Sequence, residues 1–209
     1  MTAKKDVRER VLRAAVRALA KDGFARTTAR GIAAQGGFAP GVIYYYFTDL
    51  DALYAATVEF TSREREARYR EALLEVTDAV TLVGRMRELY SEDVESGHIE
   101  TIQELFSGAR PGTELAASVT EQTRRWELLA EEVIRSLLRG SPLARFVNPA
   151  VVARAVIAHH LGLQTLTYLD ADENRMEALL AEAERLAAAY DKLPRVPPPT
   201  AGDGPRTLP

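Results

Sequence analysis

The sequence predicts an all-α protein of about nine helices. Apolar residues recur at spacings of three and four along most of its 209 residues, and no run alternates with the period of two that marks a strand. Prolines, glycines and capping residues stand between the periodic stretches, where helices begin and end. The expected helices cover residues 5–22, 30–35, 40–47, 49–75, 77–96, 98–108, 113–139, 150–169 and 172–192.

The first two helices are defined by the residues at their ends. Gly23 can end helix 5–22, because glycine readily takes the positive φ found just beyond a helix C-terminus. Helix 30–35 needs a side chain that accepts hydrogen bonds from the free N–H groups of its first turn. The hydroxyl of Thr28 meets that need, and the hydroxyl of Thr27 is the alternative.

A glycine turn at residues 36–37 separates the second helix from the third. Pro40 suits the first turn of the third helix, because the N–H that proline lacks would have no partner there. Ile43 and Phe47 are spaced to face the core. This leaves Gly41, Val42, Tyr45 and Tyr46 on or near the outer side. Two short helices joined by a tight turn fit the major groove of DNA, which is about 12 Å wide.

The later helices also start and stop at recognisable residues. Thr48 or Asp49 caps the fourth helix, and Asn148 caps the eighth. Arg-Pro-Gly at residues 110–112 stops the sixth helix, and Gly-Ser-Pro at residues 140–142 stops the seventh. These helices form the larger part of the chain.

The first fifty residues also differ in charge from the rest of the chain. Residues 1–50 contain nine Lys and Arg against four Asp and Glu, although the whole chain has a formal net charge of −3. A basic head is typical of nucleic-acid binding. The sequence has no cysteine, which excludes disulfides and thiolate metal sites and suits a reducing cytoplasm. No signal peptide is expected, and the most apolar stretch, 153–169, is too short and polar to span a membrane.

The segment from Val7 to Phe60 resembles the N-terminal head of the tetracycline-repressor (TetR) family of bacterial transcription regulators. A single Tyr-x-x-Phe would carry little weight, but an ordered set of residues stands at the family's spacing. The set consists of Ala14-Ala15, Gly23-Phe24, Thr28, Ile32-Ala33, Gly37, Gly41, the block from Ile43 to Phe47, and Leu53.

The resemblance implies which residues bind DNA. Thr28 and Arg30 are expected to contact a phosphate or an adjacent base, and Tyr44 is expected to lie nearest the phosphate backbone. The groove-facing residues would be Gly41, Val42, Tyr45 and Tyr46. Glycine lets the backbone approach a base edge, and a tyrosine ring offers apolar contact to a thymine methyl.

Two departures from the family pattern bear on DNA affinity. Ala39 stands where the family often has Ser or Thr, so the third helix loses a capping bond that typically contributes about 1 kcal/mol. Leu50 replaces a lysine that commonly contacts phosphate. Weaker binding is one expectation, and the alternative is that Lys4, Lys5 and Arg26 supply the missing phosphate contacts.

The resemblance also implies a division into domains. We expect a helix-turn-helix domain at residues 4–64, a helical effector-binding and dimerisation domain at 65–192, and a disordered proline-rich tail at 193–209. Apolar stripes on the last two helices predict a four-helix dimer interface, the alternative being that both stripes pack within one subunit. The interface residues are Val152, Val156, His159, Leu163, Met176, Leu179, Leu180, Ala183, Leu186 and Ala187.

In the family the body encloses a small-molecule pocket. The candidates here are large apolar or hydrogen-bonding residues, namely Met86, Tyr90, Phe106, Trp126, His160 and Gln164, with His98, Gln103 and Glu104 as further polar candidates. An aromatic residue on a helical stripe is alternatively a plain core residue. His159 and His160 lie about 100° apart on a helix, so no metal site is expected there, nor any cofactor.

Taken together, these features predict a ligand-responsive repressor. A homodimer would bind a palindromic double-stranded DNA operator in the bacterial cytoplasm, and an unknown small-molecule effector would release it. Activation instead of repression stays open. The rival classes are an all-α enzyme, for which no catalytic motif stands in the sequence, and a helical interaction protein that has lost DNA binding.

Overall fold

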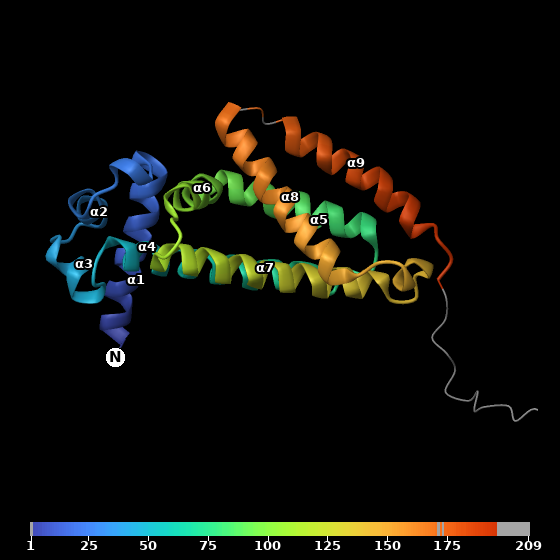
Figure 1. The fold of residues 1–209 in the computed structure, drawn as a ribbon, viewed down its shortest axis with the longest axis horizontal. Coiled ribbons are helices and arrows are strands. Elements are labelled where there is room, and N and C mark those ends of the chain that lie inside the picture. Colours follow the sequence, from blue (N-terminus) through green and yellow to red (C-terminus); the bar gives the residue numbers. More distant parts are fainter. Residues whose placement is uncertain (1, 171, 173, 196–209) are drawn as a thin grey trace, which may run out of the picture.

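The computed structural model describes residues 2–170, 172 and 174–195. Within these residues all regular structure is helical, which confirms the all-α prediction (Figure 1). The α-helices are α1 (Thr2–Asp22), α2 (Ala29–Gly36), α3 (Gly41–Tyr46), α4 (Leu50–Leu73), α5 (Ala79–Glu95), α6 (His98–Gly108), α7 (Glu114–Leu138), α8 (Pro149–Asp170) and α9 (Asn174–Asp191). Two 3-10 turns, η1 (Phe24–Arg26) and η2 (Pro142–Arg145), complete the described fold.

Helices α1 to α3 form a small head at one end of the molecule, at the left of Figure 1. The apolar face of α1 packs on α2 and on the start of α4. The fully buried side chains at the centre of the head include Leu12, Leu19, Ile32, Ile43 and Leu53. Because such a core is close-packed, it fixes the direction in which α3 presents its outer residues.

Helix α4 starts in the head and continues into the body, where it packs along α7 (Figure 1). Of the two predicted caps, Asp49 is the one used: its carboxylate accepts a hydrogen bond from the N–H of Ala52 at 2.9 Å. The predicted domain boundary at residue 64 falls inside this helix. Head and body are therefore joined by a continuous helix.

A second apolar cluster lies where α4, α5 and α7 meet. Its buried members are Tyr69, Leu73, Leu89, Leu129 and Val133. Helix α8 packs on α7, and α9 packs mainly on α5, so that these two helices form an outer layer (Figure 1). None of the described helices is both long enough and apolar enough to span a bilayer.

The C-terminal end of α9 is bonded to two distant parts of the body. The carboxylate of Asp191 accepts hydrogen bonds from the N–H groups of Ala79 and Val80, at 2.9 and 3.0 Å, at the start of α5. The hydroxyl of Tyr190 donates to the carbonyl of Leu137 at 2.7 Å, near the end of α7.

The helix boundaries lie within two residues of the expected ones, except at the start of α1. Helix α1 begins at Thr2, three residues earlier than predicted, because nothing in the first residues breaks the helix. Pro40 precedes α3 as its N-cap residue, and no side chain caps this helix, as the alanine at position 39 led us to expect. Of the predicted tail, residues 196–209 lie outside the described residues.

Candidate DNA-binding face and the polar centre of the body

Helix α2 begins at a threonine cap. The hydroxyl of Thr28 accepts a hydrogen bond from the N–H of Gly31 at 3.1 Å. Thr27, the alternative, is buried, and its hydroxyl donates to the carbonyl of Gly23 at 2.7 Å. Thr28 and Arg30 both remain exposed on the surface of the head. Gly37 ends α2 with a φ of +64°, a left-handed conformation that favours glycine.

Helix α3 presents tyrosines to solvent. Tyr45 is 68% exposed and Tyr44 is 56% exposed, whereas Ile43 is fully buried under them. Val42 and Tyr46 are half-buried, because part of each packs against the head core. A Cβ added at Gly41 would meet nothing within 4 Å. The chain's own packing therefore does not require glycine at this position, and the outer side of α3 is open to another molecule.

The N-terminal part of α1 lies beside this face and adds positive charge to it. The ammonium group of Lys4 lies 5.2 Å from the centre of the Tyr45 ring. The rings of Tyr45 and Tyr46 meet edge to face, with their centres 4.9 Å apart. Leu50 is half-buried and packs on the head core, so its apolar side chain stabilises the start of α4 where a lysine would contact phosphate.

The helix-turn-helix DNA-binding motif consists of such parts: a short exposed helix, a tight glycine turn and a basic neighbouring helix. The family of bacterial regulatory proteins called the tetR family matches this chain over residues 11–57. The head is a TetR-family DNA-binding domain. No curated protein sequence matches the chain.

Solved structures of regulators share the fold over about nine-tenths of this chain. A TetR transcription regulator from Haloarcula marismortui has a TM-score of 0.69 and 19% identity, over 90% of this chain and 97% of that one. The fatty acid degradation regulator FadR from Bacillus halodurans has a TM-score of 0.68 and 18% identity, over 90% and 97%. FadR from Bacillus subtilis, solved with stearoyl-CoA, has a TM-score of 0.67 and 16% identity, over 87% and 98%.

The body has a buried carboxylate on α5, on the side near the head. Asp93 on α5 is only 1% exposed. Its Oδ2 accepts hydrogen bonds from Nε of Arg65 at 2.9 Å and from the hydroxyl of Tyr69 at 2.7 Å, and its Oδ1 accepts one from Arg68 at 2.5 Å. The guanidinium of Arg65 also stacks over the ring of Trp126, 5.1 Å from its centre. Burial raises the pKa of Tyr69 above its ordinary value. These hydrogen bonds from two guanidinium groups and a hydroxyl offset the cost of removing the carboxylate from water.

A chain of polar side chains connects α6 to α8 nearby. Nε2 of Gln103 donates to Oε1 of Gln164 at 3.4 Å, and the hydroxyl of Thr165 donates to Oε1 of Gln103 at 3.1 Å. Nε2 of Gln164 lies 2.9 Å from Nε2 of His160, whose ring meets the ring of Tyr90 edge to face. Burial, helped by the charge of Arg65, lowers the pKa of His160 to about 4, so the imidazole is neutral at pH 7.

The structure brings together part of the predicted effector pocket. His160, Gln164 and Tyr90 belong to the polar chain, while Trp126 and Met86 adjoin the apolar cluster of the body. Phe106 lies elsewhere: it packs against the head core, because its face of α6 is the one that contacts the head.

Arg65, Tyr69 and Asp93 were not predicted from the sequence as members of a site. Charged residues surround both α4 and α5 in the sequence, so no pattern singles out the one carboxylate that is buried. The only available signal was that Asp93 follows Leu89 by one helical turn, on the buried side of α5.

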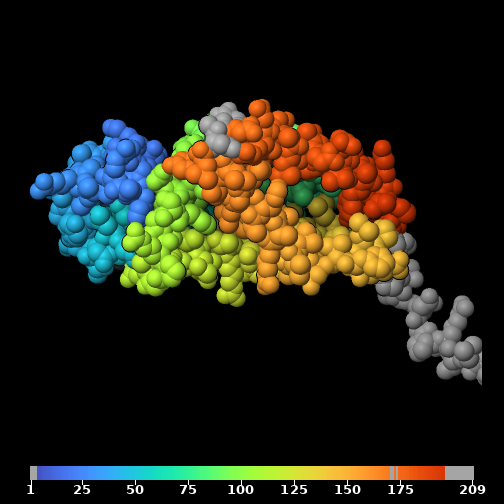
Figure 2. All heavy atoms as spheres, turned by 45° about the horizontal axis from the view of Figure 1, so that its top comes forward, coloured from blue at the N-terminus to red at the C-terminus, as the bar shows by residue number. Residues whose placement is uncertain are grey.

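The predicted dimer interface divides into exposed and interior residues. Val152, Val156, His159, Leu179 and Leu186 are exposed. Leu163 and Ala183 are half-buried. Met176, Leu180 and Ala187 are buried within the chain itself, on α9, which packs mainly on α5, so they are not free to contact a second subunit. Leu166 and Leu169 add exposed apolar surface that was not predicted. Helices α8 and α9 reach the surface on the same side of the molecule (Figure 2).

Proposed function

We propose that this protein is a sequence-specific transcriptional regulator that acts as a homodimer on a palindromic operator. The observation that carries the proposal is the outer side of α3, where Gly41, Tyr44 and Tyr45 are exposed next to Lys4. A basic surface with protruding aromatic side chains suits both phosphate and base contacts in the major groove. The match of this head to a family of transcriptional regulators supports it, and gives the enzyme alternative no support.

The assignment is tested by selecting bound duplexes from a random DNA pool at about 150 mM salt, using the full chain. We expect enrichment of a two-fold palindrome whose half-sites lie about one or two helical turns apart. Affinity for that palindrome should fall linearly with the logarithm of salt concentration, because each neutralised phosphate releases counterions. Weak DNA binding without sequence preference would instead favour an interaction protein that has lost sequence-specific DNA recognition.

The dimer is proposed to form through the exposed apolar side chains of α8 and α9. Leu186 is 63% exposed and Leu179 is 36% exposed, which leaves this apolar surface without a partner in the described chain. Four such helices, two from each subunit, make a bundle of the kind that two-fold dimers use. The separation of the two heads then follows from this contact.

Replacing Leu186 with glutamate should dissociate the dimer. Each interface would lose two buried leucines and gain two buried charges, so we expect the dissociation constant to rise at least about 100-fold. Sedimentation equilibrium measures this directly. Leu128→Glu is the matched control, because Leu128 is also an exposed leucine but lies on α7. If both variants remain dimeric, α8 and α9 do not form the contact.

The sign of regulation is proposed to be repression, relieved by a small molecule that binds in the body. FadR from Bacillus subtilis was solved with stearoyl-CoA, which supports ligand binding by a body of this fold. A bound effector acts only through its different affinity for the DNA-bound and free conformations. The polar chain through Gln103, Gln164 and His160 is the part of the body best suited to respond, because it crosses from α6 to α8. The protein would act in the bacterial cytoplasm, with its operator DNA.

A further inference from the structure

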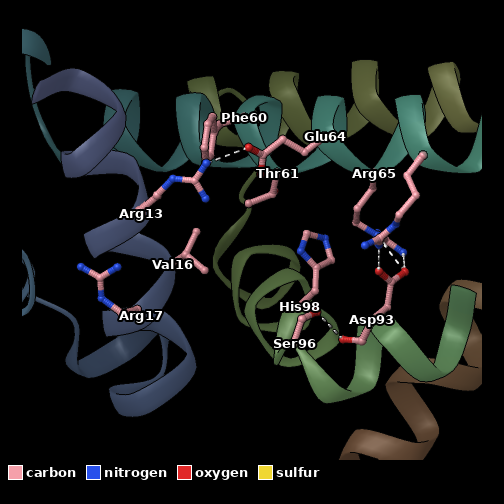
Figure 3. Close-up of a pocket in the computed structure, with 11 residues that line it drawn as sticks. Arg13, Val16, Arg17, Phe60, Thr61, Glu64, Arg65, Asp93, Ser96 and His98 are labelled. Carbon is pink, nitrogen blue, oxygen red and sulfur yellow. Dashed lines mark hydrogen bonds and ion pairs between the residues drawn. The ribbon is translucent and has the colours of Figure 1, made fainter. Parts of the chain in front are cut away.

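A pocket of about 300 Å³ opens between α1 of the head and helices α4 and α6 (Figure 3). This volume is at the lower end of the range of about 300 to 1,000 Å³ that ligand pockets occupy. Arg13 and Val16 on α1 form one wall, and Phe60 and Arg65 on α4 form another. His98, at the start of α6, forms the floor, and in Figure 3 its ring rises into the space between α1 and α4. The pocket therefore lies where the DNA-binding head meets the body.

His98 supplies a buried hydrogen-bonding group to this pocket. Its Nε2 is shielded from solvent and has no hydrogen-bond partner among the described residues. A buried polar atom of this kind costs free energy unless a partner reaches it. The N-terminus of α6 adjoins the pocket as well, and no side chain caps it, since Gly97 stands at the N-cap. Free N–H groups at a helix N-terminus favour negative charge.

The charged side chains around His98 create a positive electrostatic potential at its ring. Burial, the largest cause, and the charges of Arg65 and Arg68 lower the pKa of the imidazole, Asp93 raises it, and together they bring it to about 3. The two guanidinium groups thus outweigh the one carboxylate at this position. The positive charge of these two guanidinium groups, unlike the burial, favours an anion beside His98.

Arg13 is a cation of the pocket wall that can accept a new partner. It pairs with Glu9 and Glu64, but the side chains of all three are 40% exposed or more. Exposed pairs contribute only about 0 to 1 kcal/mol each, so an incoming anion can replace Glu64 at little cost. Arg65 is different, because the buried carboxylate of Asp93 holds it in place.

We propose that this junction pocket binds a small organic anion, whose carboxylate or phosphoryl group contacts Arg13 and His98 while its apolar part lies against Val16 and Phe60. Such a ligand would bridge α1 to α6 and take the place of Glu64 on Arg13. Its effect on DNA release rests on the proposed function, whereas binding itself does not.

The test measures binding in the absence of DNA. The full chain is titrated with succinate or inorganic phosphate, against chloride at equal ionic strength, and the melting temperature is followed. We expect succinate or phosphate to stabilise the wild type more than chloride does. Arg13→Gln and His98→Leu should each weaken binding about tenfold, the usual effect of losing a hydrogen bond to a charged group. Arg10→Gln is the matched control, because Arg10 lies on the same helix and stacks on Phe38, outside the pocket.

A second readout does not depend on stability. The chain has three histidines, so the ring C–H signal of His98 can be followed by NMR, and it should shift with either anion. The proposal is overturned if neither anion exceeds chloride, if Arg10→Gln weakens binding as much as Arg13→Gln, or if Arg30→Gln alone abolishes it, which would place the anion on the DNA-binding face. Failure of the regulator assignment would appear only in the DNA selection, so the two are distinguishable.

Discussion

Replacing both Tyr45 and Tyr46 with alanine is expected to reduce operator affinity to the level of sequence-independent binding. Tyr45 is the most exposed of the large apolar residues in the head, and its ring is braced edge to face by Tyr46. Removing both rings takes away apolar contacts to the groove together with two hydroxyl groups. Specific binding typically exceeds non-specific binding by about 10³ or more, so a loss of that order is expected.

Stability must be separated from recognition in this experiment. Tyr46 packs in part on the head core, so its removal costs some stability, whereas Tyr45 touches little besides Lys4 and Tyr46. The single variant Tyr45→Ala should therefore melt like the wild type yet bind the selected operator about 10 to 100 times more weakly. Tyr45→Phe keeps the ring and tests the hydroxyl alone. Fluorescence anisotropy with the selected duplex measures the DNA affinity of each variant. Unchanged affinity of the double variant would show that α3 does not contact the DNA.

Lowering the pH from 7 to 5 is expected to destabilise the protein by about 4 kcal/mol through His98 and His160, whose residues are half-buried and whose pKa values are lowered. The pKa values of His98 and His160 are about 3 and about 4 in the folded chain, against 6.5 for an unburied imidazole. Below pH 6.5 the two imidazoles therefore bind protons in the unfolded chain but remain neutral in the folded chain. The free energy of unfolding falls as the pH falls. Each histidine contributes about 2 kcal/mol of this loss at pH 5.

Urea unfolding at pH 7 and pH 5, at one fixed protein concentration, measures the difference. The double variant His98→Gln with His160→Gln should be much less sensitive to pH, because glutamine keeps hydrogen-bonding capacity without titrating in this range. Fixing the concentration matters, because the stability of the proposed dimer would depend on it. An equal loss in wild type and double variant would show that other groups carry the pH dependence.

The head could be predicted from the sequence almost residue by residue. Its signals are local: the hydroxyl of Thr28 and the glycine at 37 mark the two ends of one helix, and both do what the sequence predicts. Ile43 likewise faces the core as its spacing requires. Short helices with strong end signals leave few alternatives, so spacing alone orients their side chains.

The body was less predictable, because periodicity identifies an apolar face but not what covers it. On α9 the apolar residues fit one spacing of three and four, yet Met176 and Leu180 are buried within the chain while Leu179 and Leu186 face solvent. The same limit applies to polar residues. The burial of Asp93 depends on Arg65 and Tyr69, which lie more than twenty positions away, and no local pattern encodes that contact.

The bonds at the end of α9 set a limit on how the protein can be cut or fused. Asp191 occupies the first N–H groups of α5, and the side chain of Arg195 donates to the carbonyl of Leu137 at 2.9 Å. A cut before residue 190 would expose the start of one helix and the end of another, more than fifty positions away in the chain. An affinity tag or a fluorescent protein joined after residue 195 leaves every one of these bonds in place, at the end of the molecule opposite the head (Figure 1).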